Sequence, residues 1–279
     1  MMRRWTTTWI LAGLAAGCQA GVSDRDAGAS DASPRIQRVI SLHPYFRDLR
    51  SVRAVRGSDT LTFLFDRGGG ATVISPALAA SIGCRPYGRQ VGHRMDGEPV
   101  EFQACDSISF VLDGWAVRHA PVAVFDVNAV LPPSPPKLDG IVSLETFRDQ
   151  VITIDWPRSR IVVHSRDERG PALARQGLPV RVATGDNGGT LSALVPVAGR
   201  RGPLWFLLDS GDILGTLVDS HVLRDSLLTL RADSTVDLAV GDRAAERIRV
   251  TVVSINLDGV LGTAYLLRGP VSLDLRSVP

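Results

Sequence analysis

FLFDRGG, residues 63–69, and FLLDSGD, residues 206–212, are the two stretches of this chain that decide its fold. Each is an apolar run that is typical of a β-strand, and each ends at an aspartate followed by small residues that favour a tight turn. Asp66 and Asp209 therefore occupy the same place in two similar segments. Because an Asp-x-Gly turn after a strand is common, one copy alone would indicate little.

The sequence around the two turns repeats in the same order, which indicates an internal duplication. Before each aspartate the pattern predicts a hairpin, with turns at residues 56–60 and 199–202. After each aspartate come a short apolar run, a helical turn, and an alternating strand. The similar segments LDGIVSLETF, from Leu138, and LDGVLGTAYL, from Leu257, follow. Four matching features in one order are difficult to attribute to chance, so we expect two related lobes made mostly of β-strands.

The repeat divides the chain into segments. We expect an N-terminal lobe over residues 36–165 and a C-terminal lobe over 177–279, joined by the polar linker 166–176. Residues 18–35 are mostly small and polar and cannot offset chain entropy by burial, so they are predicted to form a flexible tether.

The composition is that of a folded chain with a hydrophobic core, since 44% of the 279 residues are hydrophobic and 22% are charged. A formal net charge of +2 and an aromatic content of 6% provide neither the positive field nor the stacking platforms of a nucleic-acid-binding protein. We therefore exclude nucleic acid as a partner. The five histidines are scattered without the spacing of a zinc site, so no metal is expected.

The N-terminus predicts export. Two arginines precede the apolar run 9–16, which is too short to span a bilayer but fits a secretory signal peptide over residues 1–17. The sequence LAAGC resembles a bacterial lipobox, which implies that Cys18 is lipidated and anchors the mature protein to a membrane. Gln19 after it favours an outer-membrane address in the cell envelope. The alternative is an ordinary signal peptide with an incidental cysteine.

Cys84 and Cys105 are the other two cysteines, 105 − 84 = 21 residues apart. In an exported chain they are expected to form a disulfide. The alternative is a pair of buried free thiols.

The pattern hydrophobic-hydrophobic-Asp-Thr/Ser-Gly, followed downstream by an apolar Asp-Gly segment, is similar to the pepsin and retropepsin family of aspartic proteases. The resemblance implies an all-β acid-protease fold with two pseudo-symmetric, retropepsin-like β-barrel lobes and short helices. It also implies that Asp66 and Asp209 are the catalytic pair, and that the turn residues Gly68, Ser210 and Gly211 bind substrate.

Two neighbouring carboxylates explain why such a site needs both copies. They cannot both ionise cheaply, so they share one proton. One carboxylate then accepts a proton from a held water while the other donates to the scissile carbonyl, with no cofactor. Because one chain supplies both turns, we expect it to act as a monomer on a peptide or protein substrate.

The first copy contains an extra glycine-rich stretch between Cys84 and Cys105. By resemblance this stretch is a flap that folds over the substrate, with Gly92 and Gly97 in contact with it. The disulfide would then hold the base of the flap. The alternative is a surface hairpin without a gating role.

Arg67 and Asp212 depart from the family pattern and modulate the expected activity. Arg67 replaces the usual Thr or Ser, and a guanidinium is costly to bury unless it is paired, for example with Asp66 or Asp212. Asp212 stands where Ala or Ser is usual, and Ser143 replaces a glycine of the first downstream segment. Two hypotheses follow: an active lipoprotein endopeptidase, or a noncatalytic relative that binds a peptide or envelope partner in its cleft.

Overall fold

The computed structural model describes residues 38–119, 121–165, 177–178, 180–184 and 189–276, together with Thr6 and Thr7. Cys18, the predicted tether and the predicted linker 166–176 lie outside the described residues, as does the predicted signal peptide except for those two threonines.

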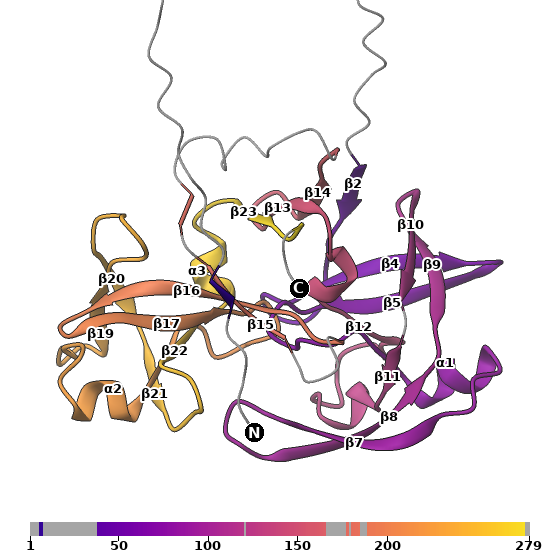
Figure 1. The fold of residues 1–279 in the computed structure, drawn as a ribbon, viewed down its shortest axis with the longest axis horizontal. Coiled ribbons are helices and arrows are strands. Elements are labelled where there is room, and N and C mark those ends of the chain that lie inside the picture. Colours follow the sequence, from indigo (N-terminus) through magenta and orange to yellow (C-terminus); the bar gives the residue numbers. More distant parts are fainter. Residues whose placement is uncertain are drawn as a thin grey trace, which may run out of the picture.

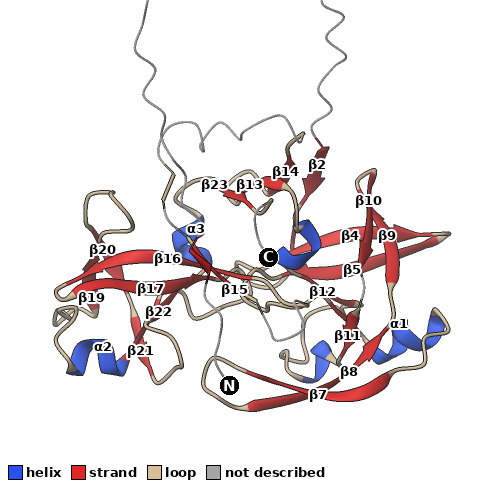
Figure 2. Cartoon of the chain, viewed as in Figure 1, coloured by secondary structure: helices blue, strands red, loops and turns tan. Residues whose placement is uncertain are grey.

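The described residues form mostly β-strands with a few short helices, so the expected all-β class is confirmed (Figure 2). The largest sheet has ten strands and lies in what we call the first lobe, residues 43–147. Its strands are β3 (His43–Pro44), β4 (Arg50–Arg56), β5 (Asp59–Phe65), β6 (Val73–Ile74), β7 (Tyr87–His93), β8 (Pro99–Cys105), β9 (Ile108–Leu112), β10 (Trp115–His119), β11 (Val122–Val124) and β12 (Gly140–Val142).

A seven-stranded and a two-stranded sheet make up most of the second lobe, the described residues of 180–266. The seven strands are β1 (Thr6–Thr7), β15 (Arg181–Ala183), β16 (Ser192–Gly199), β17 (Gly202–Leu208), β18 (Leu217–Asp219), β21 (Thr251–Val253) and β22 (Gly259–Leu261), and the two-stranded sheet pairs β19 (Thr235–Leu238) with β20 (Glu246–Arg249).

A four-stranded sheet connects the lobes, since the last strand of the chain pairs with a strand that follows the first lobe. It consists of β2 (Arg38–Ser41), β14 (Arg160–Val163), β13 (Val151–Asp155) and β23 (Val271–Asp274). Figure 1 shows this sheet above and between the indigo-to-magenta first lobe and the orange-to-yellow second lobe. The helices are α1 (Pro76–Ser81), α2 (Ser220–Arg224) and α3 (Thr263–Leu266), with 3-10 turns η1 (Val127–Ala129) and η2 (Leu144–Phe147).

The two lobes repeat the same strand arrangement around their aspartates. In the first lobe β5 runs parallel to β12, which is antiparallel to β6. In the second lobe β17 runs parallel to β22, which is antiparallel to β18. Strands β5 and β17 even share one burial pattern, with exposed starts and three buried residues before the aspartate.

The repeated Leu-Asp-Gly segments fix these strands in register. The Asp139 carboxylate accepts a hydrogen bond from the Thr62 amide at 2.7 Å. The Asp258 carboxylate accepts one from the Trp205 amide at the same distance. Each carboxylate thus connects the strand that precedes Asp66 or Asp209 to the downstream Leu-Asp-Gly segment. This shared contact explains why the sequence repeats there.

The apolar residues divide between one main core and two small clusters. Phe63, Phe65 and Phe206 point into the main core, which extends through both lobes. A first-lobe cluster contains Leu49, Leu64, Val73, Val127 and Leu138. A second-lobe cluster contains Leu207, Leu217 and Val260. The clusters lie on the opposite face of β5 and β17 from the main core, because successive side chains of a strand alternate.

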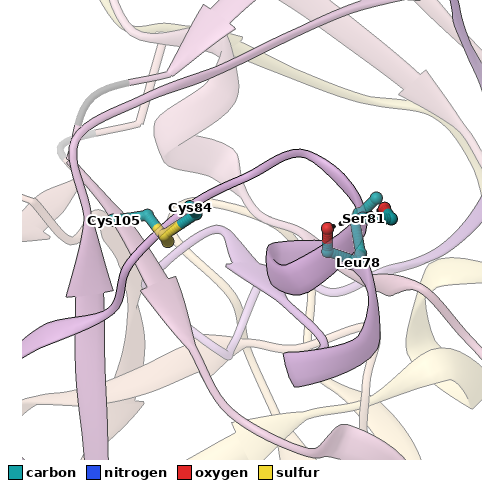
Figure 3. Close-up of a disulfide and its surroundings, with 4 residues drawn as sticks. All are labelled: Leu78, Ser81, Cys84 and Cys105. Atoms are coloured by element: carbon teal, nitrogen blue, oxygen red, sulfur yellow. Dashed lines mark hydrogen bonds between the residues drawn. A yellow bond between two sulfur atoms is a disulfide. The ribbon is translucent and has the colours of Figure 1, made fainter.

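Strands β7 and β8 form the expected hairpin, which we call the flap. The predicted disulfide is confirmed: Cys84 and Cys105 are bonded, with their Cα atoms 6.1 Å apart. Cys84 follows α1, near Leu78 and Ser81, and Cys105 ends β8 (Figure 3). The bond therefore holds the base of the flap, as expected. Within the described residues, no helix is both long and apolar enough to cross a membrane.

Candidate active site

The two parallel strand pairs position the aspartates symmetrically. The Asp66 amide donates to the Val142 carbonyl at 3.0 Å, and the Asp209 amide donates to the Leu261 carbonyl at 3.1 Å. These bonds extend the β5–β12 and β17–β22 pairings by one residue. As a result, each aspartate leaves its strand at the same point and in the same direction.

The structure brings together Asp66 and Asp209, 209 − 66 = 143 residues apart in the sequence. Their carboxyl groups lie close enough together for each to shift the pKa of the other. The turn glycines pack crosswise beneath them: a Cβ atom at Gly68 would overlap the Asp209 carboxylate, and one at Gly211 would overlap the Asp66 carboxylate. Glycine is therefore required at both positions by the close approach of the two lobes.

Backbone amides hold one oxygen of each carboxylate. Asp66 Oδ1 accepts hydrogen bonds from the amides of Gly68 at 2.8 Å and Gly69 at 3.0 Å. Asp209 Oδ1 accepts one from the amide of Gly211 at 2.7 Å. Such donors stabilise a carboxylate in its charged form. Asp66 has two of them, so it is the better-stabilised anion of the pair.

The pKa values of the two carboxyl groups differ for physical reasons. Burial raises the pKa of Asp66, and hydrogen bonds to Asp209, Gly69 and Gly68 together with the Arg67 charge lower it in part. Burial and then the negative charge of Asp66 raise the pKa of Asp209 well above its ordinary range. The pair therefore holds a proton to higher pH than a free carboxyl group does.

Ser210 links the two lobes beneath the carboxylates. Its hydroxyl accepts a hydrogen bond from the Arg67 amide at 3.0 Å and donates one to the Phe65 carbonyl at 3.1 Å. A Thr or Ser at position 67 would have the hydroxyl needed for the reciprocal bonds. Arg67 has no hydroxyl, so only one half of this symmetric link is present.

The Arg67 side chain is fully buried, and none of its three guanidinium nitrogens has a hydrogen-bond partner within the described part of the chain. Burial lowers its pKa to about 10, and the charges of Asp209 and Asp66 act against this. The group is therefore positively charged at neutral pH. The expected direct pairing of Arg67 with Asp66 or Asp212 is therefore wrong. The guanidinium is attracted to Asp209 and Asp66 only at longer range, without a hydrogen bond.

Asp212 lies buried just behind the second turn. Its Oδ1 accepts a hydrogen bond from the Leu214 amide at 2.8 Å. Burial raises the pKa of Asp212, while the amides of Leu214 and Gly215 lower it in part. The negative charge of Asp212 in turn contributes to the raised pKa of Asp209.

Ser143 and Gly262 occupy equivalent places behind the two turns but have different surroundings. Ser143 is buried and its hydroxyl lies 3.2 Å from that of Thr72, which contacts the Thr146 hydroxyl at 2.8 Å. A Cβ atom at Gly262 would overlap the Gly215 carbonyl. Glycine is therefore required in the second lobe, whereas the first lobe accommodates a serine.

Gly92 and Gly97, the two flap glycines expected to contact substrate, lie on the β7–β8 hairpin and not in the Asp66 or Asp209 turn. Gly92 faces Val100 across the hairpin. Gly97 is in the tip, has a φ of +88°, and lies against the Asn256 side chain of the second lobe. The Asn256 amide also donates to the Met95 carbonyl at 2.8 Å. Sequence reasoning missed this contact between the flap tip and the second lobe.

His221 is a second feature that the sequence did not single out. Its Nδ1 lies 2.5 Å from Asp219 Oδ1 and its Nε2 lies 3.2 Å from Asp258 Oδ1. The repeated Leu-Asp-Gly segment was the sequence signal that could have identified Asp258 as a residue of this contact. Among the described residues, no group of three or more His, Cys, Asp or Glu side chains is arranged to hold a metal ion.

No protein-family model and no curated protein matches this sequence. Solved structures resemble the fold. The basic 7S globulin from soybean aligns over 88% of this chain and 99% of its own, with a TM-score of 0.50 and 9% identity. The protein edgp aligns over 86% of this chain and 93% of its own, also with a TM-score of 0.50 and 9% identity. At this identity the likeness shows the fold alone: the chain has the all-β acid-protease fold.

Proposed function

Since the chain has the acid-protease fold with an aspartate at the end of each central strand, we propose that it is an aspartic endopeptidase that hydrolyses peptide or protein substrates. The observation that carries this proposal is the close approach of the Asp66 and Asp209 carboxyl groups, which pack crosswise against Gly211 and Gly68 and are each held by backbone amides. Burial and the neighbouring charge raise the pKa values of both carboxyl groups, which favours the shared proton that general acid–base hydrolysis requires.

We infer different roles for the two carboxyl groups. Asp66 has two amide donors and the nearby Arg67 charge, so it is the ionised member and accepts a proton from the attacking water. Asp209 has the higher pKa and donates its proton to the carbonyl oxygen as the C–O bond to water forms. When the C–N bond breaks, the proton on Asp66 passes to the leaving amine and the carbonyl forms again, with Asp209 reprotonated.

The test is cleavage of a fluorogenic peptide library between pH 3 and 8 by the parent chain, Asp66→Asn and Asp209→Asn. We expect each variant to lose roughly 10²–10⁴-fold in rate, which is the usual contribution of a positioned acid or base. Asp59→Asn, an exposed change at the start of the same strand β5, is the matched control and should cleave normally. Cleavage that persists in both active-site variants would show that the aspartates are not catalytic.

A second candidate is a noncatalytic protein that binds a peptide or an envelope partner in its cleft. The buried, unpartnered Arg67 guanidinium favours it, because it removes half of the inter-lobe link. A similar solved structure also favours it, because it is named as a basic 7S globulin and not as a peptidase. Under this candidate the folded parent chain cleaves no peptide, and Arg67→Thr combined with Asp212→Ala restores activity.

Export, lipid anchoring at Cys18 and action as a monomer belong to the same proposal, as does the division into lobes at residues 36–165 and 177–279. They rest on the sequence patterns and on both turns being in one chain. In a bacterial host, Cys18→Ala should move the protein from the membrane fraction to the soluble envelope fraction. Equal membrane attachment of both forms would refute the lipid anchor.

A further inference from the structure

The tip of the flap is attached to the second lobe. The Asn256 amide donates a hydrogen bond to the Met95 carbonyl, and Gly97 lies against the Asn256 side chain. Figure 1 shows the flap, labelled by β7, extending along the lower side of the molecule from the first lobe toward the second. The flap therefore extends from one lobe to the other, with its base held by the disulfide and its tip held by the second lobe.

The Met95 side chain provides the apolar part of this attachment. It is half-buried against the second-lobe cluster of Leu207, Leu217 and Val260. The arms of the hairpin are largely exposed: Val91, for example, is 53% exposed. The tip contact is thus distinct from the rest of the hairpin, whose outer side chains face solvent.

The second-lobe cluster lies on the same face of its strand as the aspartate. Leu207 precedes Asp209 by two residues, and side chains two apart in a strand point to the same side. Phe206 and Leu208, on the other face, belong to the main core. The cluster is therefore next to the carboxylate pair and not behind it.

The first lobe has the mirror arrangement. Leu64 precedes Asp66 by two residues and belongs to the first-lobe cluster. One apolar cluster thus flanks the carboxylate pair on each side. A peptide that lies across Asp66 and Asp209 in an extended conformation brings one side chain toward each cluster, because its own side chains alternate.

We propose that Met95 occupies the apolar subsite of the second lobe in place of a ligand side chain, so that the flap is latched shut by its own tip. A peptide enters by exchanging Met95 for an apolar side chain of similar size, such as Leu or Met. The cluster is lined by aliphatic side chains, so a charged group there would lose its hydration without gaining a partner. This inference deepens the proposed function and requires only that the cleft binds a peptide, with or without cleavage.

The test uses the full chain carrying Asp66→Asn and Asp209→Asn, so that cleavage does not consume the probe. The probes are two fluorescein-labelled alanine-based octapeptides with lysine at both ends, one with a central pair of leucines and the other with a central pair of serines. Met95→Ala is added to this background, and Val91→Ala, an exposed apolar change on the same hairpin, is the matched control.

We expect Met95→Ala to bind the leucine peptide about tenfold more tightly, which corresponds to about 1.4 kcal/mol, and to leave binding of the serine peptide unchanged. Val91→Ala should bind both peptides as the background does. Equal or weaker binding of the leucine peptide by Met95→Ala overturns the proposal, as does the absence of binding to every variant.

Hydrogen exchange at the Asn256 backbone amide gives an independent readout, because this amide donates a hydrogen bond to the Met95 carbonyl in the latched state. Met95→Ala should accelerate its exchange about tenfold while the amide of Asp209 keeps its rate. Unchanged exchange at Asn256 overturns the latch. A parent chain that cleaves no peptide but shows both effects refutes the peptidase and retains the subsite, so the two failures are distinguishable.

Discussion

Replacing Arg67 by threonine is expected to make the protein more stable, although the substitution is in the interior. The lowering of the pKa of Arg67 to about 10 corresponds to about 3 kcal/mol of disfavoured charge. Because the folded pKa lies below that of the unfolded chain, this penalty is fully present below pH 10 and is relieved only at higher pH.

Two further effects act in opposite directions. A threonine hydroxyl at position 67 has the chemistry to mirror Ser210, which makes two inter-lobe hydrogen bonds, and such bonds contribute about 1 kcal/mol each. Loss of the long Arg67 side chain leaves a cavity that costs about 2–3 kcal/mol. The net expectation is a gain of about 2–3 kcal/mol, or a rise in Tm of roughly 4–12 °C for a chain of this size.

The measurement is thermal and urea unfolding at pH 7, with Arg53→Thr as the matched control. Arg53 is exposed on β4, so its substitution should change stability by less than about 0.5 kcal/mol.

Arg67→Thr should also shift the acid limb of any cleavage profile to higher pH, because the Arg67 charge lowers the pKa of Asp66. A clearly lowered Tm for Arg67→Thr would refute the reasoning and show that the guanidinium stabilises the fold.

Three other substitutions test the site and its support. Asp209→Asn should raise the Tm at pH 7 and have no effect near pH 3, because a carboxyl group with a raised folded pKa loses stability only as the pH rises above its unfolded pKa; an equal effect at both pH values would contradict this. The double change Cys84→Ser and Cys105→Ser should destabilise by about 3 kcal/mol for a loop of 21 residues, and flap hydrogen exchange should quicken; unchanged urea unfolding would contradict it. Gly262→Ser should cost about 2–3 kcal/mol through overlap with the Gly215 carbonyl, and a variant as stable as the parent would show that the backbone yields there.

The sequence predicted the features that local pattern controls. Alternation and turn residues predicted the strands before Asp66 and Asp209, and the repeated Leu-Asp-Gly segments predicted their partners. Spacing and export predicted the bond between Cys84 and Cys105. Each of these signals lies in a short stretch of sequence and predicts the structure of that same stretch.

Long-range contacts could not be predicted in this way. The seating of Met95 on the second-lobe cluster depends on how far the flap reaches and on where the other lobe lies, and no local pattern encodes either. The same holds for the Arg67 guanidinium. The cost of burying it without a partner was clear from the sequence, but whether a carboxylate would lie within hydrogen-bond reach depended on the packing of both turns.

The unequal sequences of the two turns give the two carboxyl groups different surroundings. In a symmetric site the proton would have no preferred side, since both carboxylates would have equal surroundings. Here Arg67 lowers the pKa of Asp66, which also has two amide donors. Asp66 and Asp212 both raise the pKa of Asp209 with their charges. The two unusual turn residues therefore both change the electrostatics of the pair: Arg67 lowers the pKa of Asp66 and attracts both carboxylates, and Asp212 raises the pKa of Asp209.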